Sequence, residues 1–68
     1  METVGSRIRL IRIQKGLTQK RFSNILGVSR PYISHIENDK RKPPTVLVKL
    51  ISREFSITEQ WLVSGSVK

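Results

Sequence analysis

The chain of 68 residues contains no cysteine. Neither disulfides nor a cysteine-based zinc site can therefore supplement its core, which at this length lies near the lower limit at which hydrophobic burial alone suffices. No apolar run approaches the roughly 18–20 residues that a membrane-spanning helix needs. The N-terminal segment METVGSRIRL also lacks the charged-then-apolar layout of a signal peptide. These absences favour a single intracellular domain and no role within a membrane.

Groups that commonly carry catalysis are scarce as well. The sequence has one histidine and five aspartate and glutamate residues. These are spread along the chain, and neither a phosphate-cradling glycine loop nor a metal-ligand cluster occurs. We therefore expect the protein not to be an enzyme, and we expect it to have no metal, no cofactor and no small-molecule site.

Positive charge, by contrast, is abundant. Thirteen lysines and arginines give the chain a formal net charge of +8. Such a charge favours a polyanionic partner, which can be nucleic acid or an anionic membrane surface. Many small soluble proteins are basic, however, so the charge alone does not identify the partner.

Apolar residues recur at helical spacing, and no stretch alternates as a strand does. Three apolar segments follow a residue that can cap a helix N-terminus; these residues are Thr3, Thr18 and Thr45. The other two segments begin after Ser29 and Thr58. Gly16 and Asp39 suit the left-handed conformation that ends a helix. The pattern predicts one all-α domain over residues 1–68, with five helices at about 3–15, 19–26, 30–37, 46–54 and 59–63.

The most informative window runs from Gln19 to Asn38 and reads QKRFSNILGVSRPYISHIEN. It places Gly27 between two short amphipathic segments and a small residue, Ser23, early in the first segment. Its apolar positions are Phe22, Leu26, Val28, Ile33 and Ile36. This spacing suits two helices that cross steeply through a tight turn, a unit that presents its second helix to a groove of DNA.

The longer segment GLTQKRFSNILGVSRPYISHIENDKRKPP, with ITEQWLVSG after it, resembles the helix-turn-helix of the lambda and 434 repressor and Cro type, also called the Xre family. The resemblance extends from about Val4 to Gly65. It implies a compact five-helix lambda-repressor-like fold, double-stranded DNA as partner, and a recognition helix that enters the major groove as it does in those repressors.

Three residues depart from the pattern of that family. Ser23 stands where alanine is usual and is still small, and Asp39 stands where glycine is usual and tolerates the left-handed region. Arg21 replaces the acidic residue that often completes a capping box with the Thr18 position. Because the helix dipole disfavours a cation there, we interpret Arg21 as a contact to an external phosphate.

A helical wheel predicts which side chains of the second unit helix face outward. Ile33 and Ile36 define its buried side. At 100° per residue the opposite face centres on Pro31, Ser34, His35 and Asn38, with Arg30 and Tyr32 on its flanks. This face is either an ordinary solvated helix surface or a surface that reads DNA.

In the second interpretation four residues read bases. Arg30 is the strongest candidate, because its planar fork matches the two acceptors of guanine. Ser34 can donate or accept a hydrogen bond and is less selective, and Pro31 can make only apolar contacts, for example with a thymine methyl group. His35 can touch a base or a phosphate, or can simply be solvated.

A second group is expected to bind phosphates. The resemblance assigns Gln19 a phosphate contact that also braces the recognition helix, and it adds Thr18 through its hydroxyl or the helix N-terminus. The loop residues Lys40, Arg41 and Lys42 fall where the family approaches the sugar-phosphate backbone, although runs of charge are often only solvated. We place Asn38 in the same group. Tyr32 either reaches a phosphate or covers the edge of the core.

The wheel puts Glu37 on the core-side flank of its helix, an unfavourable place for an unpaired carboxylate. In 434-like proteins the matching arginine and glutamate pair between the first and third helices. The resemblance therefore implies a structural ion pair between Arg12 and Glu37 rather than a contact with DNA.

Four apolar residues outside this window raise the question of partners. Leu10 and Ile13 lie away from the apolar stripe of the first helix and are either scattered surface residues or a contact with a partner. Trp61 and Leu62 either close the core or contribute to a dimer interface, as in related repressors. A homodimer on DNA is expected because two symmetric domains read half-sites about one helical turn apart.

The leading functional hypothesis is a sequence-specific transcriptional regulator of the prokaryotic or phage type. We expect a repressor that acts as a dimer on a near-palindromic operator and is located in the cytoplasm, associated with the nucleoid. One alternative is an adaptor or antitoxin-type subunit that uses the same fold to bind protein. Another is non-specific binding to nucleic acid or membrane surfaces by charge alone.

Overall fold

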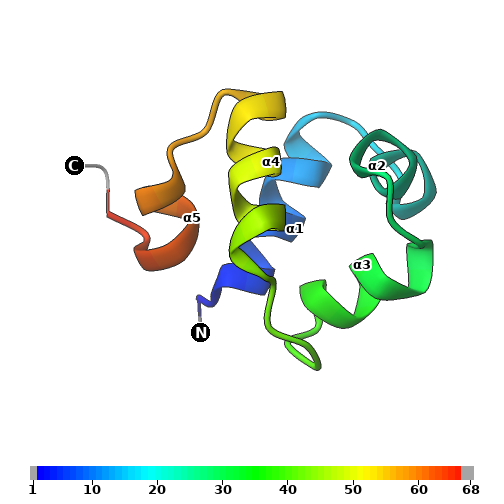
Figure 1. The fold of residues 1–68 in the computed structure, drawn as a ribbon, viewed down its shortest axis with the longest axis horizontal. Coiled ribbons are helices and arrows are strands. Elements are labelled where there is room, and N and C mark those ends of the chain that lie inside the picture. The colour runs from blue at the N-terminus through cyan, green and yellow to red at the C-terminus, as the bar shows by residue number, and fades with distance from the viewer. Residues whose placement is uncertain (1, 67–68) are drawn as a thin grey trace.

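The computed structural model describes residues 2–66, and within them the chain forms five α-helices and no strand (Figure 1). Their bounds are α1 Val4–Gln14, α2 Gln19–Leu26, α3 Arg30–Glu37, α4 Thr45–Phe55 and α5 Glu59–Ser64. The expected all-α class is confirmed, and each predicted helix lies within one residue of the observed bounds. None of the described helices is both long and apolar enough to cross a membrane.

Hydroxyl side chains cap four of the helices, and the caps at Thr3 and Thr18 are the ones that the sequence predicted. Thr18, Ser29 and Thr58 each accept a hydrogen bond from the backbone N–H three residues further on. The Thr3 hydroxyl likewise accepts from the Ser6 N–H, and the Thr3 N–H in turn donates to the Ser6 hydroxyl, which completes a capping box. The prediction for α4 is wrong. Thr45 is its first helical residue, and the extended backbone of Pro44, which has no hydroxyl to offer, precedes it.

The helix ends use left-handed residues. Gly16 and Gly27 have φ of 70° and 73°, and the expected left-handed conformation of Asp39 is present at φ 61°. At the end of α2 the Val28 N–H donates to the Ser23 carbonyl at 3.0 Å, which closes the turn into α3. Ser56 ends α4 with φ 56°, a left-handed residue that the sequence analysis did not identify.

Every helix contributes to one hydrophobic core. Its buried members are Ile8, Ile11, Phe22, Leu26, Ile33, Ile36, Leu47, Val48, Ile51 and Leu62. The ring of Phe22 also stacks on that of Phe55, with centroids 5.4 Å apart. Ser23 is 1% exposed, and its hydroxyl donates to the Lys20 carbonyl at 2.7 Å, so the small polar residue is satisfied inside α2.

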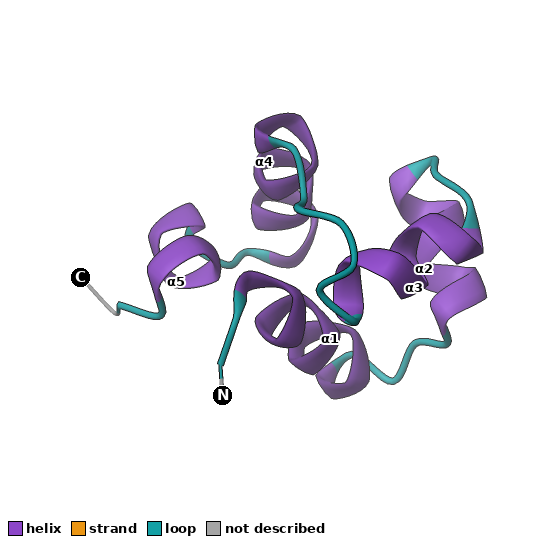
Figure 2. Ribbon diagram, turned by 90° about the horizontal axis from the view of Figure 1, so that it is seen from below, coloured by secondary structure: helices purple, strands orange, loops and turns teal. Residues whose placement is uncertain are grey.

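Two views show how this core positions the surface of α3. In both, α1 and α4 lie in the middle, α5 lies on one side of them, and α2 with α3 lies on the other (Figures 1 and 2). α3 packs on α2 and α1, whereas α5 packs on α1 and α4. The outward face of α3 is therefore on the side of the molecule away from α5.

α1 approaches the end of α3 closely at Gly5. A Cβ atom added at Gly5 would lie 2.1 Å from the carbonyl oxygen of Ile36 and 2.6 Å from Oδ1 of Asp39. Asp39 also accepts a hydrogen bond from the Thr3 hydroxyl at 2.9 Å. Glycine at position 5 thus lets the start of α1 lie directly against the end of α3.

A buried arginine ties α5 to α1. Arg7 is 7% exposed, and its Nε and Nη2 donate to the carbonyl oxygens of Leu62 at 2.8 Å and Val63 at 2.9 Å. Its Nη1 also lies 3.4 Å from the Glu2 carboxylate. Arg7 therefore satisfies carbonyl groups at the end of α5 that the helix itself leaves without partners.

Candidate nucleic-acid interface

The structure places the predicted base-reading residues on one side of α3. Ile33 and Ile36 are completely buried, which fixes the rotation of the helix. Arg30, Pro31 and His35 are exposed and Ser34 is half-buried. This exposed face, with its flanks at Arg30 and Tyr32, is called the reading surface below.

At one flank the reading surface is held by α2. Arg30 Nη1 donates to Oε1 of Gln19 at 3.2 Å. The other end of the same amide, Nε2 of Gln19, donates to Oε1 of Glu37 at 3.1 Å. Gln19 thus links the first residue of α3 to its last residue, and it turns an acceptor towards the guanidinium of Arg30.

The ion pair expected between Arg12 and Glu37 is present and has two bonds. Arg12 Nε lies 2.7 Å from Oε2 of Glu37, and Arg12 Nη2 lies 3.1 Å from Oε1. The Glu37 side chain is 1% exposed, so the pair lies inside the protein. Arg12 Nη1 also donates to the Leu17 carbonyl at 2.8 Å. The brace that the resemblance assigned to Gln19 is present, but its bond to Glu37, as the second partner of that carboxylate, was not predicted because nothing local in the sequence relates positions 19 and 37.

The other flank of the reading surface carries a stacked pair. The guanidinium carbon of Arg41 lies 5.2 Å from the centroid of the Tyr32 ring, within the range of a cation–π interaction. Lys40, Arg41 and Lys42 are all exposed in the loop between α3 and α4, called the basic loop below. Tyr32 and Arg41 were expected as separate phosphate contacts, and their contact with each other was not predicted.

The remaining phosphate candidates lie at the start of α2 and at the C-terminal end of α3. Thr18 and Arg21 are exposed, and the Thr18 hydroxyl accepts a hydrogen bond from the Arg21 N–H at 3.1 Å. Asn38 is exposed, and its Nδ2 donates to the Ser34 carbonyl at 2.9 Å.

Of the two suggested dimer residues, only Trp61 is accessible at the surface. Leu62 is 0% exposed and belongs to the core, so it cannot contact a second copy unless the fold changes. Trp61 is half-buried and lines a shallow pocket with Leu10 and Ile57. Leu10 and Ile13 are 43% and 48% exposed, so both remain on the surface of α1.

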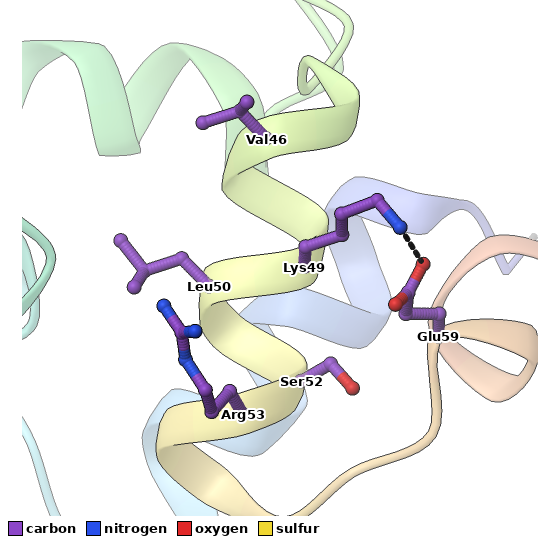
Figure 3. Close-up of a pocket in the computed structure, with 6 residues that line it drawn as sticks. All are labelled: Val46, Lys49, Leu50, Ser52, Arg53 and Glu59. Atoms are coloured by element: carbon purple, nitrogen blue, oxygen red, sulfur yellow. Dashed lines mark ion pairs between the residues drawn. The ribbon is translucent and has the colours of Figure 1, made fainter.

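A second pocket runs along the outer face of α4 (Figure 3). Its lining residues are Val46, Lys49, Leu50, Ser52, Arg53 and Glu59. Lys49 Nζ lies 3.5 Å from Oε1 of Glu59, and this ion pair joins α4 to α5. The one carboxylate of this pocket is thus engaged by a lysine, and the lining offers no second acidic or histidine side chain for acid–base chemistry. Residues 2–66 also contain no group of histidine, aspartate and glutamate that could hold a metal ion.

Comparisons with known proteins match this arrangement along nearly the whole chain. A family model described as a helix-turn-helix domain covers residues 5–66. A propionyl-CoA carboxylase regulator of Cereibacter sphaeroides is 38% identical over 53 residues, which are 78% of this chain and 12% of that protein. Antitoxin PezA of Streptococcus pneumoniae is 33% identical over 55 residues, which are 81% of this chain and 35% of that protein. The chain therefore spans only a small part of the length of these relatives.

One solved structure is similar over the entire fold. It is the P22 c2 repressor in complex with a synthetic operator, and it superposes with a TM-score of 0.87 at 24% sequence identity. The match covers 97% of this chain and 100% of that chain. At this level of identity the similarity establishes the arrangement of the five helices and nothing about individual contacts.

Proposed function

The chain belongs to the helix-turn-helix domain family of DNA-binding regulators, as the resemblance to lambda-repressor-like proteins predicted, and on this premise we propose that it reads a specific double-stranded DNA sequence. Residues 1–68 act as one binding domain. The recognition helix is α3, which enters the major groove with its N-terminal half. The regulator acts in the cytoplasm, where bacterial or phage DNA is accessible.

The observation that best supports this proposal is the position in which Gln19 holds the exposed guanidinium of Arg30. Its guanidinium is exposed at the N-terminal end of the reading surface and is held by the Gln19 amide at 3.2 Å. Arginine that is held in this way presents two parallel donors to the O6 and N7 acceptors of guanine. Gln19 in turn is braced by the buried Glu37, so the contact is prepared before DNA is bound.

We further propose that the protein acts as a repressor and as a homodimer on a near-palindromic operator. One α3 helix reads only a few base pairs, and two-fold symmetric domains reading half-sites about one helical turn apart supply the missing affinity. Apolar residues suited to a second copy are present outside the reading surface; they are the exposed Leu10, Ile13, Val46 and Val63 and the half-buried Trp61.

Selection of bound sites from a random duplex pool tests the proposal. We expect the enriched sites to share a symmetric motif that contains guanine at a position read by Arg30. Arg30→Ala should weaken binding to the enriched site by about 1–3 kcal/mol and relax the preference at that one position. Arg53→Ala is the matched control, because Arg53 lies in the last turn of α4, at the end remote from the basic loop (Figure 3). Equal losses in the two variants would contradict base reading by Arg30.

A second candidate function is that of an antitoxin subunit, favoured by the similarity to antitoxin PezA. The exposed Leu10 and Ile13 on α1 offer a surface for a protein partner. The same selection separates the two candidates. Absence of duplex binding at low salt would favour the protein-binding role. If the protein instead binds all duplex sequences in the pool equally well, it binds by charge alone.

A further inference from the structure

The reading surface has two edges, and the structure holds an arginine at each of them. With Ile33 and Ile36 buried, Arg30 and Tyr32 fall on opposite flanks of the outward face of α3. Gln19 from α2 holds Arg30 through a hydrogen bond. At the opposite flank the holder is an aromatic ring, and the arginine that it holds, Arg41, comes from the basic loop rather than from α3.

The end of α3 explains how Arg41 reaches that ring. Asp39 takes the left-handed conformation, and the Lys40 N–H donates to the His35 carbonyl at 2.8 Å. This bond folds the chain back along α3. Arg41 therefore lies beside α3, with its guanidinium over the half-buried ring of Tyr32, the third residue of that helix.

The hydrogen-bonding groups of Arg41 are free for a ligand. Its guanidinium has five N–H donors, and the contact that the structure gives this group is with the Tyr32 ring, whose centroid lies 5.2 Å from the guanidinium carbon. Among residues 2–66, no acceptor is hydrogen-bonded to the side chain of Arg41. Within the same described residues, Lys40 and Lys42, its neighbours in the basic loop, make no ring contact of this kind.

We propose that Tyr32 is a positioning residue whose ring holds Arg41 at the edge of the reading surface opposite Arg30, so that Arg41 meets a DNA phosphate there. The inference rests on the proposed DNA-binding function. The contribution of Tyr32 comes from its ring face, and its hydroxyl is dispensable. Because Arg41 is restricted before binding, it loses less conformational freedom on contact than a free surface arginine does.

A double-mutant cycle on duplex binding tests this role. The probe is a mixed-sequence duplex, titrated between about 50 and about 200 mM salt, where phosphate contacts dominate. Tyr32→Phe should bind within about two-fold of the wild type, and Tyr32→Leu should bind about two- to five-fold more weakly, the range of an exposed cation–π interaction. Arg41→Ala should cost less in the Tyr32→Leu background than in the wild type. Lys40→Ala, from the same loop, should cost the same in both backgrounds.

Two further measurements separate positioning from a loss of folding. Arg41→Lys keeps the positive charge but lacks the planar guanidinium, so it should weaken duplex binding. In the Arg41→Lys background, Tyr32→Leu should cause no further loss of duplex affinity. In the free protein, the side-chain protons of Arg41 should show a ring-current shift by NMR that Tyr32→Phe retains and Tyr32→Leu abolishes. The melting temperature of each variant shows whether the fold persists.

The outcomes distinguish this inference from the proposed function. If Tyr32→Phe binds as weakly as Tyr32→Leu, the hydroxyl contacts DNA directly and the positioning role is wrong. If the wild type binds the duplex and the losses of binding free energy from Tyr32→Leu and Arg41→Ala are additive, only the positioning role is overturned. Failure of the wild-type protein to bind any duplex would overturn both the role and the function on which it rests.

Discussion

At the scale of single residues, one buried carboxylate organises a flank of the reading surface. Glu37 accepts two hydrogen bonds from Arg12 and one from Gln19. An amide has one donating and one accepting end, so the bond to Glu37 determines which end of Gln19 faces Arg30. The same carboxylate therefore contributes to stability through Arg12 and to the preparation of the reading surface through Gln19.

Arg12→Ala should lower the free energy of unfolding by about 3 kcal/mol, because it leaves the charge of Glu37 buried without its main partner. Thermal unfolding followed by circular dichroism measures this loss. In the double variant with Glu37→Gln, no buried charge remains and the loss should be smaller. Full additivity of the two substitutions would show that the residues do not stabilise each other.

Two non-glycine residues within the described range 2–66 adopt positive φ, and they should respond differently to substitution by glycine. Ser56→Gly relieves a left-handed conformation and should stabilise the protein by about 0.5–1 kcal/mol. Asp39→Gly relieves similar strain but removes the hydrogen bond to Thr3, so it should gain less or lose stability. Melting temperatures of the two variants, measured side by side, check the order. A larger gain at Asp39 would show that its carboxylate contributes nothing.

At the scale of elements, the position of α3 depends on how closely α1 approaches it. Gly5 lies inside the first turn of α1, directly over the carbonyl group of Ile36 at the end of α3. No conformational requirement selects glycine at this position, because no positive φ occurs there. The absence of a side chain is what the contact requires.

Gly5→Ala should destabilise the protein by about 1–3 kcal/mol or more, because a methyl group would overlap backbone atoms that cannot turn aside. Gly16→Ala is the control. A Cβ atom at Gly16 meets nothing within 4 Å, and its cost of about 1 kcal/mol comes from φ alone. Denaturant unfolding of both variants makes the comparison. Equal costs would mean that α1 can move away from α3 without loss.

Helix bounds and the outward face of α3 could be predicted because both follow from local signals. Caps such as Thr18 and Ser29 bond within three residues, and the wheel needs only the spacing of Ile33 and Ile36. Contacts between distant segments could not be predicted in the same way. The stacking of Arg41 on Tyr32 depends on the reversal at Asp39, and the approach at Gly5 depends on the packing angle of two helices. The predicted cap at Thr45 failed because Pro44 already provided the extended residue that starts α4.

At the scale of the whole molecule, the acidic groups near α3 do not offset the positive charge of the reading surface. Glu37 is buried and paired with Arg12, and the exposed Asp39, which is bonded to the neutral hydroxyl of Thr3, is one negative charge against the four positive charges of Arg30, Lys40, Arg41 and Lys42. Glu59 pairs with Lys49 on the other side of α4. The net charge of +8 therefore remains effective where the basic loop and Arg30 are exposed.

Duplex binding should accordingly weaken as salt is added, and Lys42 should account for part of that dependence. Lys42→Gln is expected to lower the slope of log K against log salt by about one, the signature of a single lost phosphate contact, and to weaken all sequences alike. Arg53→Gln removes the same charge at the remote end of α4 and should leave the slope unchanged. A change in base preference in Lys42→Gln would contradict the assignment of Lys42 to the phosphate backbone.

The bonds from Arg7 to the end of α5 have a consequence for how the molecule opens. A helix of six residues is too short to persist in water by itself. α5 can therefore detach only by leaving a buried guanidinium without its carbonyl partners and the core without Leu62. Because that combination costs a large share of the stability of so small a protein, we expect the amides of α5 to exchange with solvent at the rate set by global unfolding. The last helix would then report on the integrity of the entire molecule, although it lies on the side remote from the reading surface.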